Sequence, residues 1–124
     1  MRDERGQAMT EFALVLPLLT LLLFGVIQFG IAFHNYVMIT DATRAGARKA
    51  AVSRDLADPA AAAQAAVRAS ANGLDQDDLS VAVSSSFEQG SDVTVTTSYP
   101  YSISLLGLIV KSGRLSSTTT ERVE

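Results

Sequence analysis

Residues 6–33 read GQAMTEFALVLPLLTLLLFGVIQFGIAF, and no residue from Phe12 to Phe33 carries a charge. At about 1.5 Å of rise per residue, a helix of about twenty apolar residues spans a hydrocarbon core of about 30 Å. This stretch therefore predicts a membrane span over residues 12–33. A cleaved secretory signal peptide competes with this interpretation, but the apolar run is too long, and HNYVM, which follows it, is no small-residue cleavage site.

Few residues interrupt this span, and each carries a structural expectation. Thr20 costs little because a helical hydroxyl can bond back to its own helix. Gln28 is more costly, and we expect it to contact a partner helix. Pro17 removes one backbone hydrogen bond and predicts a kink or an unwound turn. Glu11 lies at the N-terminal edge of the span, five residues after Gly6, where a carboxylate is costly and needs an explanation.

The composition limits what the rest of the chain can be. With 124 residues in total, at most one small domain remains outside the span. The absence of cysteine excludes disulfides and thiolate chemistry, and the net charge of −3 offers no basic surface for nucleic acid. The composition, 48% hydrophobic and 19% charged, fits a small membrane-anchored protein rather than a disordered one.

No pattern in the sequence predicts catalysis, a cofactor or a metal site. The single histidine, His34, follows the span, where amphipathic side chains favour the membrane interface, so no nucleophile–base pair is expected. The acidic group LDQDDL lacks the glycine and the distal glutamate of a calcium loop, and we interpret it as a solvated turn; its carboxylates are Asp75, Asp77 and Asp78.

Two helices are expected beyond the membrane. The first continues the span through residues 41–51, DATRAGARKAA, which are rich in helix formers. Arg44 and Arg48 share one face of it and Gly46 allows close packing, so this segment is either a solvated face or a docking surface for another subunit. A second helix over residues 60–71 is predicted by a capping aspartate, a proline at its first turn and a C-terminal Asn-Gly; these are Asp58, Pro59, Asn72 and Gly73.

The C-terminal part predicts strands. Residues 79–87 and 93–99 alternate apolar and polar side chains, which indicates a hairpin with one apolar face, and Pro100 is expected to end it. Residues 103–110, ISLLGLIV, are too short to span a bilayer. They form either a short buried helix over the sheet, which we favour, or an exposed patch that docks a partner. Residues 114–123 predict a third strand, either a solvated edge or one that accepts a strand from another subunit.

The N-terminal motif resembles the processing site of type IV pilins and pseudopilins, in which a peptidase cuts after a glycine and a glutamate is the fifth residue after it. Gly6 and Glu11 have this spacing, so Gln7 would start the mature chain. Phe12 and Pro17 match the Glu-Phe pair and the following proline of the TadE-like pseudopilins of tight-adherence pili. The Ala/Gly/Arg-rich segment that follows the helix in that family is matched by Ala42, Arg44, Gly46, Ala47 and Arg48.

The resemblance implies an organisation and a function. The fold class is α+β: a long N-terminal transmembrane helix, then a small domain with a second short helix and a small antiparallel sheet of about three strands. Residues 1–6 would be a prepilin-type leader, 7–52 the N-terminal helix and 53–124 a small extracytoplasmic domain. The protein would be a minor pilin or pseudopilin of a tight-adherence (Flp/Tad, type IV-like) pilus or related secretion system, acting in fiber initiation, assembly or adhesion.

The implied partners are the membrane, a prepilin peptidase, other pilins or pseudopilins and assembly platform proteins. The implied location is the bacterial inner membrane, as a single-pass protein with a cytoplasmic N-terminus that can be incorporated in a surface pilus. In the assembled fiber, Glu11 would pair with the α-amino group of Gln7 of a neighbouring subunit. Counting cations favours the opposite orientation, but Arg44 follows Phe33 by eleven residues, roughly 16 Å, which weakens that bias. Two alternatives remain: a permanently anchored platform subunit, and a single-span sensor with a small ligand-binding domain.

Overall fold

The computed structural model describes residues 2–105 and 107–124. Met1, the first residue of the expected leader, and Leu106, within the expected apolar run, lie outside these ranges. The described elements follow one another as two helices and then three strands: α1 (Arg2–Ala51), α2 (Pro59–Ser70), β1 (Ser80–Ser84), β2 (Asp92–Leu105) and β3 (Leu108–Arg122). The predicted α+β class is confirmed.

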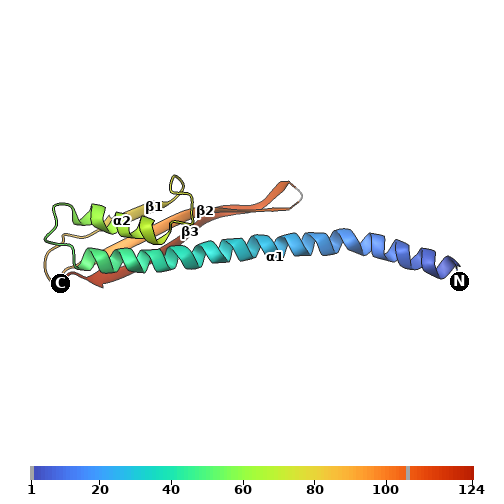
Figure 1. The fold of residues 1–124 in the computed structure, drawn as a ribbon, viewed down its shortest axis with the longest axis horizontal. Coiled ribbons are helices and arrows are strands. Elements are labelled where there is room, and N and C mark those ends of the chain that lie inside the picture. The colour runs from blue at the N-terminus through green and yellow to red at the C-terminus, as the bar shows by residue number, and fades with distance from the viewer. Residues whose placement is uncertain (1, 106) are drawn as a thin grey trace.

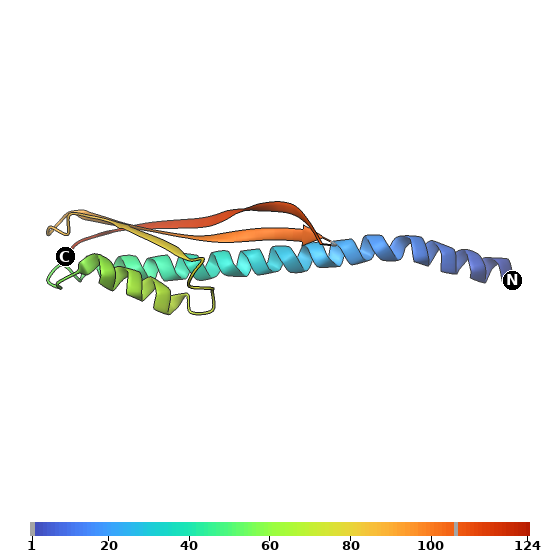
Figure 2. The ribbon, with the colours of Figure 1, turned by 90° about the horizontal axis from the view of Figure 1, so that it is seen from above.

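The molecule is built along α1. The three strands form an antiparallel sheet in the order β1-β2-β3. One face of this sheet packs on the C-terminal half of α1 and on α2, while the N-terminal half of α1 projects beyond the domain (Figures 1 and 2). The folded part therefore includes the second half of the long helix.

Helix α1 is continuous over 50 residues, and it begins before the position expected from the sequence. Residues 2–6, assigned to a leader, are helical as well. The helix is uninterrupted at Pro17, so the unwound turn does not occur; Figure 1 shows the ribbon curving through its N-terminal part. Thr20 bonds back to the carbonyl oxygen of Leu16 at 2.9 Å, as expected for a hydroxyl in an apolar helix.

Helix α2 begins as its sequence predicted. The Asp58 carboxylate accepts a hydrogen bond from the backbone N–H of Ala61 at 3.1 Å, and Pro59 occupies the first turn. The buried side of the helix consists of Ala63 and Val67, which face α1 and the sheet. Because this apolar side is small, the helix depends on its tertiary packing.

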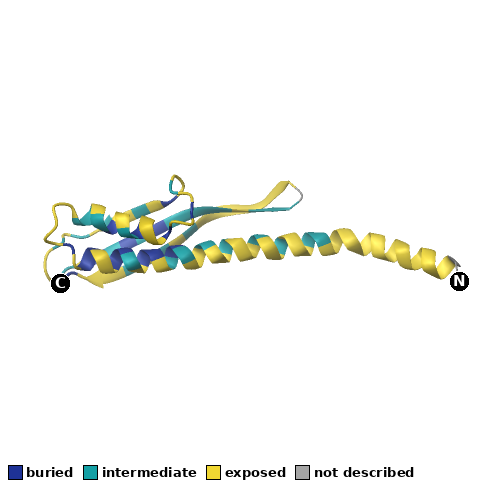
Figure 3. Ribbon diagram, in the orientation of Figure 1, coloured by how far each residue is buried: buried dark blue, intermediate teal, exposed yellow. Residues whose placement is uncertain are grey.

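The core lies between the helices and the sheet, at the end of the molecule away from the N-terminus (Figure 3). α1 contributes mainly small side chains to it, with Ile39 as the largest fully buried one. β2 contributes Val93 and Val95, and Val123 follows the end of β3. Such a core lets helix and strand backbones approach closely.

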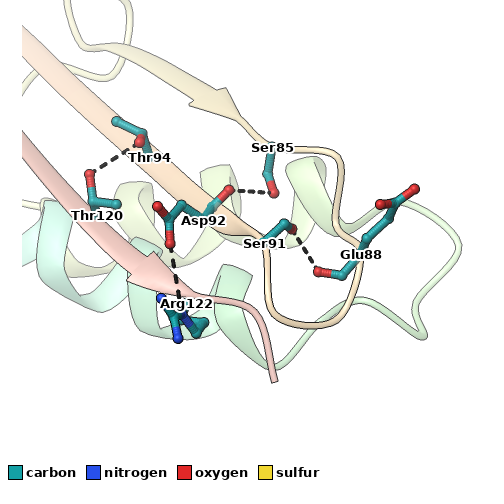
Figure 4. A network of polar contacts seen from close by, with 7 residues as sticks. All are labelled: Ser85, Glu88, Ser91, Asp92, Thr94, Thr120 and Arg122. Carbon is teal, nitrogen blue, oxygen red and sulfur yellow. Dashed lines mark hydrogen bonds and ion pairs between the residues drawn. The ribbon is translucent and has the colours of Figure 1, made fainter.

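The outer face of the sheet is polar. Paired threonines join β2 and β3: the hydroxyls of Thr94 and Thr120 are 3.1 Å apart, as are those of Thr96 and Thr118. At the sheet end (Figure 4), the Ser85 hydroxyl donates to the Asp92 carbonyl at 2.9 Å. Further contacts there join Ser91 to the Glu88 carbonyl at 2.6 Å and Arg122 to Asp92 at 4.0 Å.

The expectations for the end of the hairpin were wrong. β2 does not stop at Pro100, because β1 pairs only as far as Ser98 and the strand beyond it has a free edge that accommodates proline. The described residues of the 103–110 run form the ends of β2 and β3 and the turn between them, not a buried helix. Leu108, Ile109 and Val110 are exposed, and docking of a partner there remains a prediction. The third strand accordingly begins at Leu108 instead of residue 114.

Thr97 offers a test of how the core is packed. Its side chain is fully buried, and its hydroxyl has no hydrogen-bond partner among the described residues. Because an unpaired buried hydroxyl is unfavourable and valine has nearly the same shape, Thr97→Val should raise the free energy of unfolding by about 1 kcal/mol. Urea denaturation of the full chain in detergent micelles, followed by tyrosine fluorescence, measures this.

A matched control separates the effect of the unpaired Thr97 hydroxyl from a general gain in stability when valine replaces threonine in a strand. Thr96 precedes Thr97 on the opposite face, and its hydroxyl pairs with that of Thr118. Thr96→Val should leave stability unchanged or lower it, since it breaks a cross-strand hydrogen bond. Destabilisation by Thr97→Val would show that the Thr97 hydroxyl has a hydrogen-bond partner in the folded protein.

Candidate functional site

The largest feature of the surface is the uncovered apolar half of α1. An 18-residue window of this helix has a mean hydropathy of 2.4, and none of it is buried. Phe12 and Phe33, at the two ends of the expected span, are 61% and 59% exposed. By length and composition, α1 can cross a membrane. So much exposed apolar surface requires lipid or other apolar helices around it.

The candidate processing and register residues lie at the start of this surface. Gly6 has open space around the position of a β-carbon, and its carbonyl accepts a hydrogen bond from the Thr10 hydroxyl at 2.8 Å. The exposed carboxylate of Glu11 accepts a hydrogen bond from the Gln7 side-chain amide at 3.3 Å. Among the described residues, no cation forms an ion pair with Glu11. Gln7 and Glu11 are thus neighbours on one face of the helix.

Further along α1, one stripe of positions is half-covered by the β2–β3 hairpin of the same chain. The stripe has helical spacing and consists of Leu21, Gly25, Gln28, Ala32 and Asn35. Gln28 borders two grooves on the hairpin side, one with Ser104 and Gly107 and another with Tyr101. The polar residue that we assigned to a partner helix therefore faces the hairpin of its own chain.

In the segment with Arg44, Gly46 and Arg48, the glycine is buried and the two arginines are exposed. Arg44 and Arg48 are exposed, and the Arg44 guanidinium lies 3.8 Å from the Asp41 carboxylate. Gly46 is buried against α2: a β-carbon there would lie 2.2 Å from Cγ2 of Val67. Gly46 thus packs against α2 of its own chain. A contact with another subunit remains a prediction for the two arginines.

The stripe under the hairpin was not predicted from the sequence. A partial signal was present: Gly25, Gln28 and Ala32 are half-covered, while most leucines and all phenylalanines of the span are exposed. Such segregation marks the side of a membrane helix that contacts protein. The alternation of β2 and β3 did not indicate that their hairpin would reach this far along α1.

The other polar groups considered from the sequence are His34 and the acidic segment LDQDDL. His34 is exposed on α1. The acidic segment is a turn, as expected, in which the Asp75 carboxylate accepts a hydrogen bond from the N–H of Asp77 at 3.0 Å. Within residues 2–105 and 107–124, no three histidine, aspartate or glutamate side chains are grouped as metal ligands would be.

In a comparison with known protein families, the model of the TadE-like protein family matches residues 6–48 of the chain. The match starts at Gly6 and ends at Arg48, so it contains the candidate processing and register residues and the two exposed arginines. No curated protein and no solved structure matched the chain. The resemblance drawn from the sequence is confirmed over residues 6–48, where the chain is similar to the TadE-like protein family.

Proposed function

We propose that this protein is a minor pilin or pseudopilin of a tight-adherence pilus or a related secretion system. The observation that carries the proposal is the uncovered apolar surface of α1 with a single carboxylate, Glu11, at its edge, inside the segment that matches the TadE-like family. A plain anchor needs the apolar surface only. A subunit that leaves the membrane for a fiber also needs a polar contact that fixes its position among neighbouring helices.

Glu11 is suited to such a contact once the chain has been cut after Gly6. Cleavage would place a new α-amino group on Gln7, whose side chain already bonds to the Glu11 carboxylate. Within one helix these two residues are four apart, about 6 Å along the axis. A carboxylate buried among packed helices needs a cation, and the α-amino group of an adjacent subunit supplies one at a defined axial offset.

Gly6 is suited to the cutting step for a separate reason. It lies inside a helix, and a peptidase requires its substrate backbone to be locally opened. Glycine is less favourable than alanine in a helix by about 1 kcal/mol, so it lowers the cost of opening at this position. The open space around Gly6 also leaves its backbone accessible.

We therefore expect Gly6→Ala to slow or block removal of the leader in cells that contain the cognate prepilin peptidase. Intact-mass spectrometry of the membrane-extracted protein measures the outcome. The unaltered protein should start at Gln7, whereas the variant should retain residues 1–6.

Gly30→Ala is the matched control, because Gly30 also lies in α1 with nothing near the position of a β-carbon. This variant should be processed normally. Finding residue 1 intact in the unaltered protein, with an active peptidase present, would show that the processing assignment is wrong.

Entry into a fiber separates the proposed function from a permanently anchored platform subunit. Both would be membrane proteins, and both would be compatible with cleavage after Gly6. Recovery of the mature protein in filaments sheared from the cell surface supports the pilin assignment. Strict retention in the membrane fraction of cells that make such filaments favours the platform subunit.

A further inference from the structure

The outer end of the β2–β3 hairpin lies against the part of α1 that is expected to be in the membrane. Leu105, the last residue of β2, lines an apolar groove with Leu21 and Leu22 of α1. Gly107, in the turn, lines another with Phe24. Figures 1 and 2 both show the hairpin running along α1 toward the N-terminus.

This position conflicts with a hydrocarbon core that extends as far as Phe33. Leu21 precedes Phe33 by twelve residues, about 18 Å along the helix axis, so the hairpin would reach beyond the middle of the bilayer. Among the described residues beyond Ser98, β2 pairs with β3 alone, so both outer edges of this part of the hairpin are unpaired. Strand edges exposed to lipid at that depth carry a cost of several kcal/mol per unpaired polar group.

The side chains at this end are nevertheless suited to lipid. Leu108, Ile109 and Val110 are 73%, 69% and 63% exposed, although they are consecutive and apolar. The next residue, Lys111, is exposed and borders a groove with Phe33 and Tyr36 of α1. Apolar side chains followed by a lysine are typical of a segment that enters the membrane interface and keeps its charge among the headgroups.

We propose that the hairpin end, Leu105 with Leu108–Val110, inserts shallowly into the lipid leaflet on the side of the folded domain. The hydrocarbon core then ends near Gln28 instead of Phe33. Residues 12–28 would span it with Glu11 still at the edge, since seventeen residues rise about 26 Å, and about 17–25 residues suffice to cross a bilayer. Leu21, beside the hairpin end, would lie about 10 Å below this boundary, close to the depth of about 5–10 Å that interfacial segments reach.

Because the hairpin is held against α1, we expect lipid to contact its exposed end. The domain core fixes the sheet to α1 through Ile39 and Val95, and the strand pairing of β2 with β3 continues from there to Leu105 and Leu108. Crossing of the membrane by α1 therefore brings the hairpin end to the bilayer. The proposal rests on this crossing and not on membership of a fiber, so failure of the pilin assignment would leave it intact.

The test uses the absence of cysteine in the chain. Ile109→Cys receives an environment-sensitive nitrobenzoxadiazole label, and the full chain is reconstituted in phosphatidylethanolamine–phosphatidylglycerol vesicles. Ser116→Cys is the control on the same strand, seven residues or about 23 Å from Ile109. Ser86→Cys is a second control in the exposed loop before β2. Iodide is added before vesicle closure so that it reaches both membrane faces.

The Ile109 label should show blue-shifted emission, quenching by lipids that carry a spin label high in the acyl chain, and loss of quenching by iodide. The two control labels should be quenched by iodide and not by these lipids. Iodide quenching of the Ile109 label equal to that of the controls would overturn the proposal. Protection from iodide without lipid quenching would also overturn it, because protein would then cover the hairpin end.

Discussion

Gly46→Ala is expected to destabilise the folded domain by about 2 kcal/mol, although alanine is the better helix former. The added methyl group would lie 2.2 Å from Cγ2 of Val67 and 3.3 Å from the carbonyl oxygen of Ala63. Val67 is fully buried and β-branched, so it cannot move aside freely. Urea denaturation of the full chain in micelles, followed by tyrosine fluorescence, gives the free energy of unfolding.

A second substitution separates this clash from a general effect of losing glycine. Val67→Ala alone should cost about 2 kcal/mol through the cavity that it leaves. In the double variant the new methyl group occupies part of that space. The double variant should therefore lose about 1–2 kcal/mol less stability than the sum of the losses in the two single variants.

The matched control is Gly73→Ala, whose methyl group would meet the flexible end of Met38 at 3.2 Å. A thioether side chain adapts readily, so this variant should change stability little. Strictly additive effects at Gly46 and Val67 would contradict the close approach of α1 and α2.

Glu11→Leu is expected to abolish fiber assembly while leaving membrane insertion intact. The substitution lengthens the apolar run, which favours insertion. It also removes one partner of the proposed pair with the Gln7 α-amino group, and breaking a buried ion pair costs about 3–5 kcal/mol at each contact. Each subunit contact would then weaken roughly 100-fold to 1,000-fold or more, since 1.4 kcal/mol corresponds to a factor of ten.

The readouts are the membrane content of the protein and the amount recovered in sheared filaments. Glu11→Gln keeps the shape without the charge and should fail like the leucine variant. Glu11→Asp keeps the charge on a shorter side chain and should retain part of the assembly. If the leucine variant assembles normally, Glu11 is only a headgroup-level residue favoured by the helix dipole.

Local patterns allowed several elements to be predicted. The length and polarity of residues 12–33 indicated the membrane helix, because spanning a bilayer depends on consecutive apolar residues alone. Asp58 and Pro59 marked the start of α2, because a cap acts within one turn of the helix. Alternation around Val83 and Val95 indicated the hairpin, since each strand exposes one face to water.

Residues 103–110 could not be assigned in this way. Eight nearly continuous apolar residues have no period that distinguishes a strand from a short helix. Their structure depends on pairing with distant partners, such as Ile103 with Lys111, and on a turn at Gly107 with a φ of +82°. Pro100 was misjudged for a related reason, since its effect depends on where β1 stops pairing.

By itself, the sequence determined that a long apolar helix carries a motif with Gly6 and Glu11 at its start and is followed by a small α+β domain. These properties depend on composition and on spacing within a few turns. Only the tertiary structure decided which side of α1 is covered: it placed Gly46 under α2 and Gln28 under the hairpin. A helix has the same backbone on every side, so its covered side is fixed by the segments that fold onto it.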